Sequence, residues 1–160
     1  MSVLARLGLM AGLLALAGAP AQAQEAHAPG AASNLVIRIE NVSARGGMVR
    51  LGLYTRAAYP NDKSEPVAAA DVPARAGETI ITLKAIPPGV YAVETFQDIN
   101  ANGKMDTSWI GLPLEPFGFS RDARPFLSKP DFDDVKVTLV PGENHLTVHL
   151  QNFMSWAPRK

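Results

Sequence analysis

The chain has 160 residues, with Lys+Arg 15 and Asp+Glu 15, so its formal net charge is zero. A zero balance offers no basic excess to release counterions from phosphates, which argues against a nucleic-acid partner. The sequence has no cysteine, which excludes disulfides and a cysteine-linked lipid anchor, so the fold must be stabilised by packing or by a bound ion.

The first residues, MSVLARLGLMAGLLALAGAPAQAQ, have the form of a cleaved export signal. Arg6 supplies a positive start, an apolar run follows, and Ala21-Gln22-Ala23 fits the small-x-small cleavage pattern. A membrane anchor is the alternative, but spanning a bilayer takes about 20 apolar residues and this run is shorter. The sequence therefore predicts a signal peptide over 1–23, no transmembrane anchor after cleavage, and a periplasmic or secreted protein.

After a lead-in over residues 24–33, short β-forming runs alternate with turn signals. The clearest run is Met48 to Tyr54, in which Val49, Leu51 and Leu53 occupy every second position. This alternation is typical of a half-buried strand. The run at 67–72 is predicted as a short edge strand. The predicted strands are 35–39, 48–54, 67–72, 79–83, 90–97, 135–139 and 145–150.

Turn residues separate these runs. Ile86-Pro87-Pro88-Gly89 combines proline, which presets φ, with glycine, which accepts positive φ. Residues 141–144 (PGEN) are predicted as a hairpin connection, and no segment of the mature chain keeps a helical period. The predicted fold is all-β, an antiparallel β-sandwich of about seven strands of immunoglobulin-like or prealbumin-like kind. A single domain is predicted over 34–152, followed by a C-terminal tail at 153–160.

Residues 96 to 109, FQDINANGKMDTSW, carry acids and amides at alternate positions. They contain D-x-N-x-N-G-x-x-D, the first nine positions of an EF-hand-type calcium loop. Short Asx side chains at this spacing can converge on one hard cation, and the glycine permits a sharp turn that brings a backbone carbonyl inward. The predicted ligands are the side chains of Asp98, Asn100, Asn102 and Asp106 and the carbonyl of Lys104, with Gly103 at the turn.

The loop departs from the EF-hand pattern at the twelfth position, where Trp109 replaces the bidentate glutamate. A distant carboxylate must complete the shell, and the affinity for Ca²⁺ is predicted to be weak, on the order of 10⁻⁴ to 10⁻³ M. The alternative is a turn without an ion, since Asx and glycine residues dominate tight turns in any case. Glu115 is the first candidate for the missing ligand, followed by Asp122, Asp131, Asp133 and Asp134.

The segment 110–134 is long for a connection and rich in aromatic residues, which is typical of functional loops. One interpretation is that its aromatic side chains cap an end of the sandwich as a small satellite core. The other is that they form a stacking platform for a sugar or a peptide, as rigid anchors do at binding sites. The candidate ligand-binding residues in that second interpretation are Trp109, Phe117 and Phe119.

The sequence favours a protein without catalytic activity. Gly118-Phe119-Ser120-Arg121-Asp122 begins like a nucleophile elbow but lacks the final glycine and the strand–turn–helix context. His145 and His149 lie on one strand about 13 Å apart, too far to chelate one ion, and we expect both to face solvent. No nucleophile–base pair emerges, so no catalytic residue is predicted.

The strings IPPGVYAVETFQD, GLPLEPFGFS and KPDFDDVKVTL, together with the calcium-type loop, resemble the bacterial domain-of-unknown-function family numbered 2141. The resemblance covers residues 35–150. Members are typically exported proteins without an established activity, so the resemblance implies an exported β-sandwich and names no function. The first string is also similar to the PPG-Y hairpin of prealbumin-like and carboxypeptidase-regulatory-like domains, which is an analogy of fold alone.

Together these features predict an exported structural or binding protein in which Ca²⁺ pins the long loop to the scaffold. The alternative is a carbohydrate- or peptide-binding module that uses the aromatic loop 109–132. A carbohydrate or a protein is the possible partner, and the sequence does not identify it.

Overall fold

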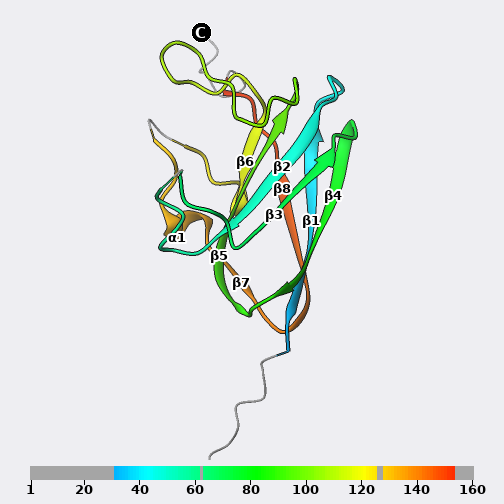
Figure 1. Ribbon diagram of the computed structural model, residues 1–160, viewed down its shortest axis with the longest axis vertical. Coiled ribbons are helices and arrows are strands. Elements are labelled where there is room, and N and C mark those ends of the chain that lie inside the picture. The colour runs from blue at the N-terminus through cyan, green and yellow to red at the C-terminus, as the bar shows by residue number, and fades with distance from the viewer. Residues whose placement is uncertain (1–30, 62, 126–127, 154–160) are drawn as a thin grey trace, which may run out of the picture.

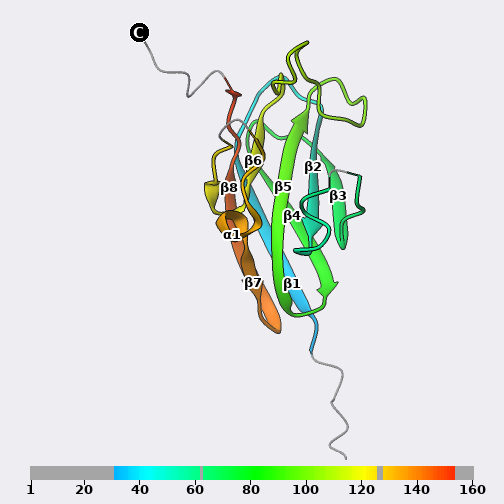
Figure 2. The ribbon, with the colours of Figure 1, turned by 90° about the vertical axis from the view of Figure 1, so that its left-hand side faces the viewer.

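The computed structural model describes residues 31–61, 63–125 and 128–153. It confirms the predicted all-β fold: two β-sheets face each other along the length of the molecule (Figures 1 and 2). The predicted signal peptide, most of the lead-in and residues 154–160 of the tail lie outside the described residues. No helix within these ranges is long and apolar enough to cross a membrane.

One sheet has three strands and the other has five. The three-stranded sheet has the order β4-β1-β8, formed by Gly77–Ile86, Ser33–Val42 and Gly142–His149. The five-stranded sheet has the order β3-β2-β5-β6, formed by Ala68–Pro73, Met48–Tyr54, Gly89–Asp98 and Phe117–Phe119, and β7 (Val137–Leu139) also pairs with β5. A 3₁₀ turn, η1 (Ser120–Asp122), and a one-turn helix, α1 (Phe132–Val135), complete the described elements.

The predicted hairpin at residues 141–144 is wrong. β7 pairs with β5 in one sheet, whereas β8 starts at Gly142 and pairs with β1 in the other. The proline–glycine turn therefore carries the chain between sheets, as does the Pro87-Pro88 turn between β4 and β5. Both crossovers lie at the lower end in Figure 1. As a result β8 runs parallel to β1, an exception to the predicted antiparallel pairing.

The main core fills the space between the two sheets, and strand alternation builds it. In β2, Val49, Leu51 and Leu53 point inward and are buried, as the sequence predicts. The predicted edge strand is β3, which pairs only with β2 in the five-stranded sheet. The remaining core comes from the same alternation in other strands, including Leu35, Ile37, Ile39, Ile81, Val93 and Val148.

A second, smaller core lies on the outer face of the five-stranded sheet. Phe132 of α1 packs edge-to-face on Tyr59, with ring centroids 5.8 Å apart. Ala92 and Val135 complete this buried cluster. Part of the aromatic segment 110–134 therefore forms a satellite core, in line with the first of its two interpretations. β6, η1 and the first three residues of α1 lie within this segment, for which the sequence predicts no regular element.

Candidate functional site

The calcium-type loop begins where β5 ends, at Asp98 (0% exposed). One carboxylate oxygen of Asp98, Oδ1, accepts the Asn102 N–H at 3.0 Å, and the other, Oδ2, accepts the Gly103 N–H at 2.8 Å. Gly103 has φ +86°, the left-handed conformation that its predicted place in the turn requires. The first and middle positions of the motif are thus tied together through backbone donors.

A cation from the neighbouring strand neutralises Asp98. The Arg50 Nε–H donates to Asp98 Oδ2 at 2.7 Å, and the same guanidinium contacts Asp71 on β3. Burial alone would raise the pKa of Asp98, but the hydrogen bonds from Arg50, Gly103 and Asn102 outweigh it, so the pKa of Asp98 lies below its ordinary value. The sequence does not predict this role of Arg50, because a single outward arginine in β2 does not reveal which strand lies beside it.

Two exposed side chains of the motif, Asn100 and Asn102, converge on the half-buried Asp106. The amide of Asn100 donates from Nδ2 to Asp106 Oδ2 at 2.6 Å, and the amide of Asn102 donates from Nδ2 to Asp106 Oδ1 at 2.9 Å. The amide oxygens face backbone donors, since Asn100 Oδ1 accepts the Asn102 N–H and Asn102 Oδ1 accepts the Lys104 N–H, both at 3.1 Å. The loop is closed by its own hydrogen bonds.

Glu115 is the distant carboxylate that reaches the loop. Its side chain is buried, with 4% of the residue exposed, and it binds both ends of the loop. Its Oε1 accepts the Ile99 N–H at 2.7 Å and its Oε2 accepts the Asp106 N–H at 3.0 Å. The sequence predicts that Glu115 joins the loop, and in this structure it does so as an acceptor for two backbone N–H groups.

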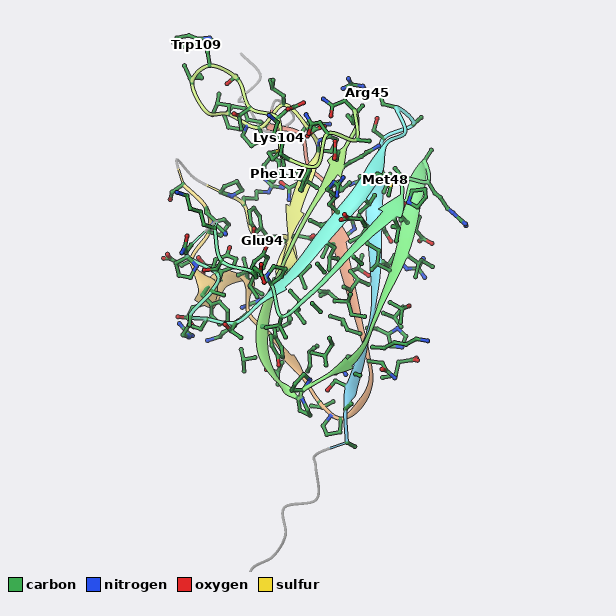
Figure 3. The ribbon with its side chains drawn as sticks, in the orientation of Figure 1. Arg45, Met48, Glu94, Lys104, Trp109 and Phe117 are labelled. Atoms are coloured by element: carbon green, nitrogen blue, oxygen red, sulfur yellow. The ribbon has the colours of Figure 1, made fainter. Side chains whose placement is uncertain are left out.

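Residues 106–114 form a small hairpin that projects from the loop. The Leu114 N–H donates to the Asp106 carbonyl at 2.9 Å, and Thr107 and Pro113 form an antiparallel bridge. Trp109, at the tip, is 97% exposed and lies far from Phe117 (Figure 3). Phe117 is buried and packs edge-to-face with Phe119, with ring centroids 6.1 Å apart. The three predicted ligand-binding aromatics therefore do not form one surface.

The other carboxylates named as candidate ligands have different surroundings. Asp122 pairs with His149, and Asp133 pairs with Arg56 and Lys136. Asp131 and Asp134 are exposed beside or within α1, away from the loop in Figure 1. Among the described residues, no group of three or more His, Cys, Asp or Glu side chains is arranged to hold a metal ion. An ion at the loop would need amide and carbonyl oxygens.

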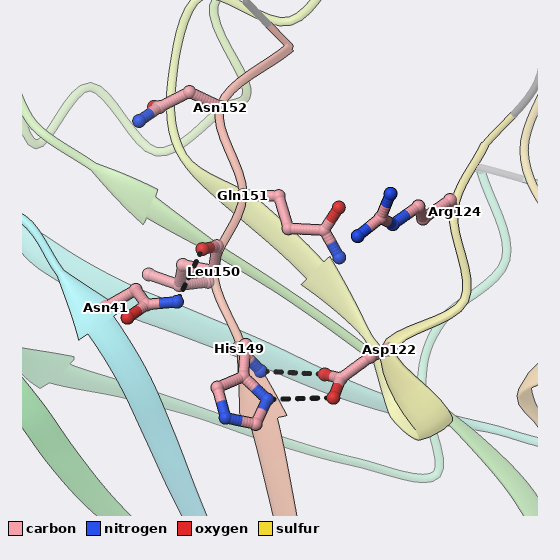
Figure 4. A pocket seen from close by; sticks show the side chains of 7 residues that line it. All are labelled: Asn41, Asp122, Arg124, His149, Leu150, Gln151 and Asn152. Atoms are coloured by element: carbon pink, nitrogen blue, oxygen red, sulfur yellow. Dashed lines mark hydrogen bonds and ion pairs between the residues drawn. The ribbon is translucent and has the colours of Figure 1, made fainter. Parts of the chain in front are cut away.

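A carboxylate–histidine pair lies at the edge between the two sheets (Figure 4). Asp122 Oδ2 is 2.7 Å from His149 Nδ1, Asp122 Oδ1 accepts the His149 N–H at 2.9 Å, and Glu40 Oε2 lies 3.2 Å from His149 Nε2. The hydrogen bond that His149 donates to the Asp122 carboxylate raises the pKa of His149 above its ordinary value, and the negative charge of Glu40 adds to this. His149 is therefore held by two carboxylates and is only partly exposed, whereas the sequence predicts a solvated side chain. Its partner Asp122 lies 27 residues away, which no local pattern reveals.

Ser120 has a structural environment. It is fully buried, its Oγ accepts the Val93 N–H at 3.0 Å, and its hydroxyl donates to the Val135 carbonyl. Its hydroxyl thus bridges β5 and the end of α1.

Comparisons with known proteins give one match. A family model described as "Uncharacterized protein conserved in bacteria (DUF2141)" matches residues 37–147, in agreement with the resemblance in the sequence. No curated protein and no solved structure matches the chain.

Proposed function

The chain belongs to DUF2141, a family of uncharacterized proteins conserved in bacteria, and within it we propose that this member is an exported, non-catalytic structural or binding module whose loop at 98–115 takes up Ca²⁺. The observation that carries the proposal is the convergence of Asn100, Asn102 and Asp106 in one loop. Glu115 holds this loop in place by accepting the Asp106 N–H. These oxygen-bearing side chains are the ligand type that Ca²⁺ prefers.

Binding would require two amide groups to turn. In the structure, Asn100 and Asn102 present their NH₂ groups to Asp106. Rotating each amide would direct its oxygen toward the Asp106 carboxylate and release the backbone N–H groups that the oxygens now accept. The Lys104 carbonyl and water would supply further ligands. Because Asp98 is already neutralised by Arg50, the site keeps little excess negative charge, which supports weak affinity.

The role of the ion would be to stabilise the hairpin at 106–114 against the sandwich. The protein has no disulfide that could do so. A dissociation constant on the order of 10⁻⁴ to 10⁻³ M matches the calcium levels that an exported module meets. Export itself rests on the signal-like segment at 1–23.

Calorimetric titration of Ca²⁺ into chelator-treated protein tests the proposal. We expect saturable heat, a melting temperature that rises at millimolar Ca²⁺, and loss of both in Asp106→Asn. Asp134→Asn is the matched control, because Asp134 is an exposed aspartate away from the loop. If the wild-type protein gives neither heat nor a change in melting temperature, the loop is a turn that holds itself together without an ion.

One observation favours a second candidate, a carbohydrate- or peptide-binding module. Trp109 presents nearly its whole side chain at the tip of the hairpin, where an indole ring can stack on a sugar or a peptide side chain. A glycan array would show binding that Trp109→Ala abolishes. An array without signal for the wild-type protein would dispose of the carbohydrate version, and unchanged peptide affinity in Trp109→Ala would dispose of the peptide version.

A further inference from the structure

The outer face of the five-stranded sheet carries a groove of about 660 Å³ between the hairpin at 106–114 and the satellite core. Strands β2, β5 and β6 form its floor, Met105 and Leu112 stand on one side, and Lys129 lies on the other. Its volume falls within the range of small-molecule sites, about 300–1,000 Å³. Neither the calcium-type residues nor Trp109 lines it.

The lining of the groove is mostly apolar. Tyr54, Phe96 and Phe119 project from three adjacent strands, and each is partly exposed. In a two-sheet protein, this face would ordinarily carry polar side chains. Aromatic rings that converge on a concave surface are the usual lining of a pocket for a ring-bearing ligand.

A glycine in the floor shapes the groove. Gly52 lies opposite Glu94 in the sheet, and a Cβ atom placed on it would lie 2.6 Å from the Tyr54 ring. The ring of Tyr54 therefore occupies the space that a side chain at position 52 would need. Gly52 does not have positive φ, so its backbone conformation does not demand glycine. Glycine is required at position 52 because the Tyr54 ring leaves no space for a side chain.

The charged side chains that line the groove are compensated by neighbours. Glu94 forms an ion pair with Lys129, whose ammonium also donates to the Tyr59 carbonyl at 2.8 Å and lies 4.3 Å from the Tyr59 ring centroid. Arg50, the third charged lining residue, pairs with Asp98 and Asp71. A ligand with a net charge would have to disrupt one of these pairs, whereas a neutral ligand would not.

From this shape and charge balance we propose that the groove binds a neutral, ring-containing small molecule. Its rings would lie over Tyr54 and Gly52 and between Phe96 and Phe119, and a polar end would reach the Glu94–Lys129 pair (Figure 3 labels Glu94). None of the proposed calcium ligands lines this site.

The test is a fluorescence titration with N-phenyl-1-naphthylamine, a neutral probe with three aromatic rings. We expect saturable binding of one probe per chain. Gly52→Val pushes the Tyr54 ring into the groove and should weaken binding about tenfold or more. Gly89→Val is the matched control: a Cβ on Gly89 would meet the Tyr91 ring at 3.2 Å in the same Gly-x-Tyr arrangement, but outside the groove. Its affinity for the probe should stay within about twofold of wild type.

A second matched pair of variants keeps the test valid if the Gly52 variant misfolds. Leu112→Glu places a charge in the apolar wall of the groove, whereas Leu114→Glu places it two residues away on an exposed side chain that does not line the groove. Only Leu112→Glu should weaken probe binding. In amide NMR spectra, the probe should shift the resonances of Gly52 and Gly118, both of which line the groove.

Three results would overturn the inference: no saturable binding, equal affinity in all four variants with native circular dichroism, or NMR shifts confined to the three-stranded sheet. Each titration is run with chelator and again with Ca²⁺. Probe binding that persists in chelator while calorimetry shows no Ca²⁺ uptake leaves the groove supported and the ion site refuted. Calcium uptake without probe binding supports the ion site and refutes the groove.

Discussion

Replacing Arg50 by methionine tests how the loop is held at its base. The substitution keeps the aliphatic stem but removes the guanidinium that compensates Asp98, whose carboxylate is fully buried. Losing one partner of a fully buried pair costs about 3–5 kcal/mol, whereas an exposed pair contributes about 0–1 kcal/mol. The Arg50 side chain is 22% exposed and Asp98 keeps two backbone donors, so we expect a loss of about 2–3 kcal/mol in the free energy of unfolding.

Urea unfolding of the wild-type protein and two variants measures this loss. Arg38→Met is the control, because Arg38 pairs with Glu78 through side chains that are 51% and 38% exposed, and its removal should cost less than about 1 kcal/mol. The folded-state pKa of Asp98 lies below the ordinary value of 3.8, so the stability from this pair is present above that pH and is lost as the pH falls through the lowered pKa. The gap between wild type and Arg50→Met should therefore narrow in acid.

The Ca²⁺ affinity of Arg50→Met is a second measurement on the same variant. With Arg50 gone, Asp98 contributes an uncompensated charge beside the loop, so Arg50→Met should bind Ca²⁺ more tightly than wild type. For a dissociation constant of about 1 mM, a Ca²⁺ concentration of about 10 mM would restore about 1.4 kcal/mol. If Arg50→Met costs no more than Arg38→Met, the buried carboxylate does not depend on the guanidinium, and the electrostatic account of the loop is wrong.

Three further changes test other parts of the fold. Gly47→Ala should cost at least about 2 kcal/mol in urea unfolding, because Gly47 has φ +84° and its Cβ would lie 2.1 Å from the Asp98 carbonyl oxygen; an unchanged midpoint would contradict this close approach. Glu115→Gln should cost about 1–3 kcal/mol, because an amide NH₂ would face a backbone donor, and faster amide exchange at 99 and 106 would report the loss. The pKa of His149 is raised, so the pairing of protonated His149 with Asp122 stabilises the fold below about pH 6.5. This stabilisation is lost as the pH rises through the raised pKa. In Asp122→Asn, the His149 pKa measured by NMR titration should return toward its ordinary range. An unchanged His149 pKa would refute the pairing.

The strands were predictable where burial alternates along the chain. β2 has the predicted bounds, Met48–Tyr54, because its inner face meets the core while its outer face does not. Which strands pair with each other was harder to predict from the sequence. Nothing local in residues 141–144 tells that β8 leaves β7 and joins β1, since the turn residues specify a change of direction and the partner strand is chosen by long-range packing. α1 has only four residues, too few for a helical period to register.

At the loop, spacing predicted which residues meet and left open how they meet. Asp98 accepts the Gly103 N–H within the loop, and Glu115 reaches the Asp106 N–H from further along the chain. The motif does not reveal that backbone N–H groups take up most of these oxygens. That outcome depends on Arg50 and on the path of residues 107–114, both set by tertiary contacts.

The loop and the groove share one structural element. Glu115 holds the Asp106 N–H at the start of the hairpin, and the same hairpin carries Leu112, which forms one wall of the groove. The position of that wall therefore depends on how firmly the loop is closed. A cation at Asp106 would tighten the closure from above as Glu115 does from below, so an ion site and a ligand groove in this protein would be coupled through the hairpin, even though they have no residue in common. The two ends of the sandwich differ in this respect: the turns at the lower end in Figure 1 connect strands, while the opposite end carries a loop whose own hydrogen bonds set the shape of a neighbouring surface.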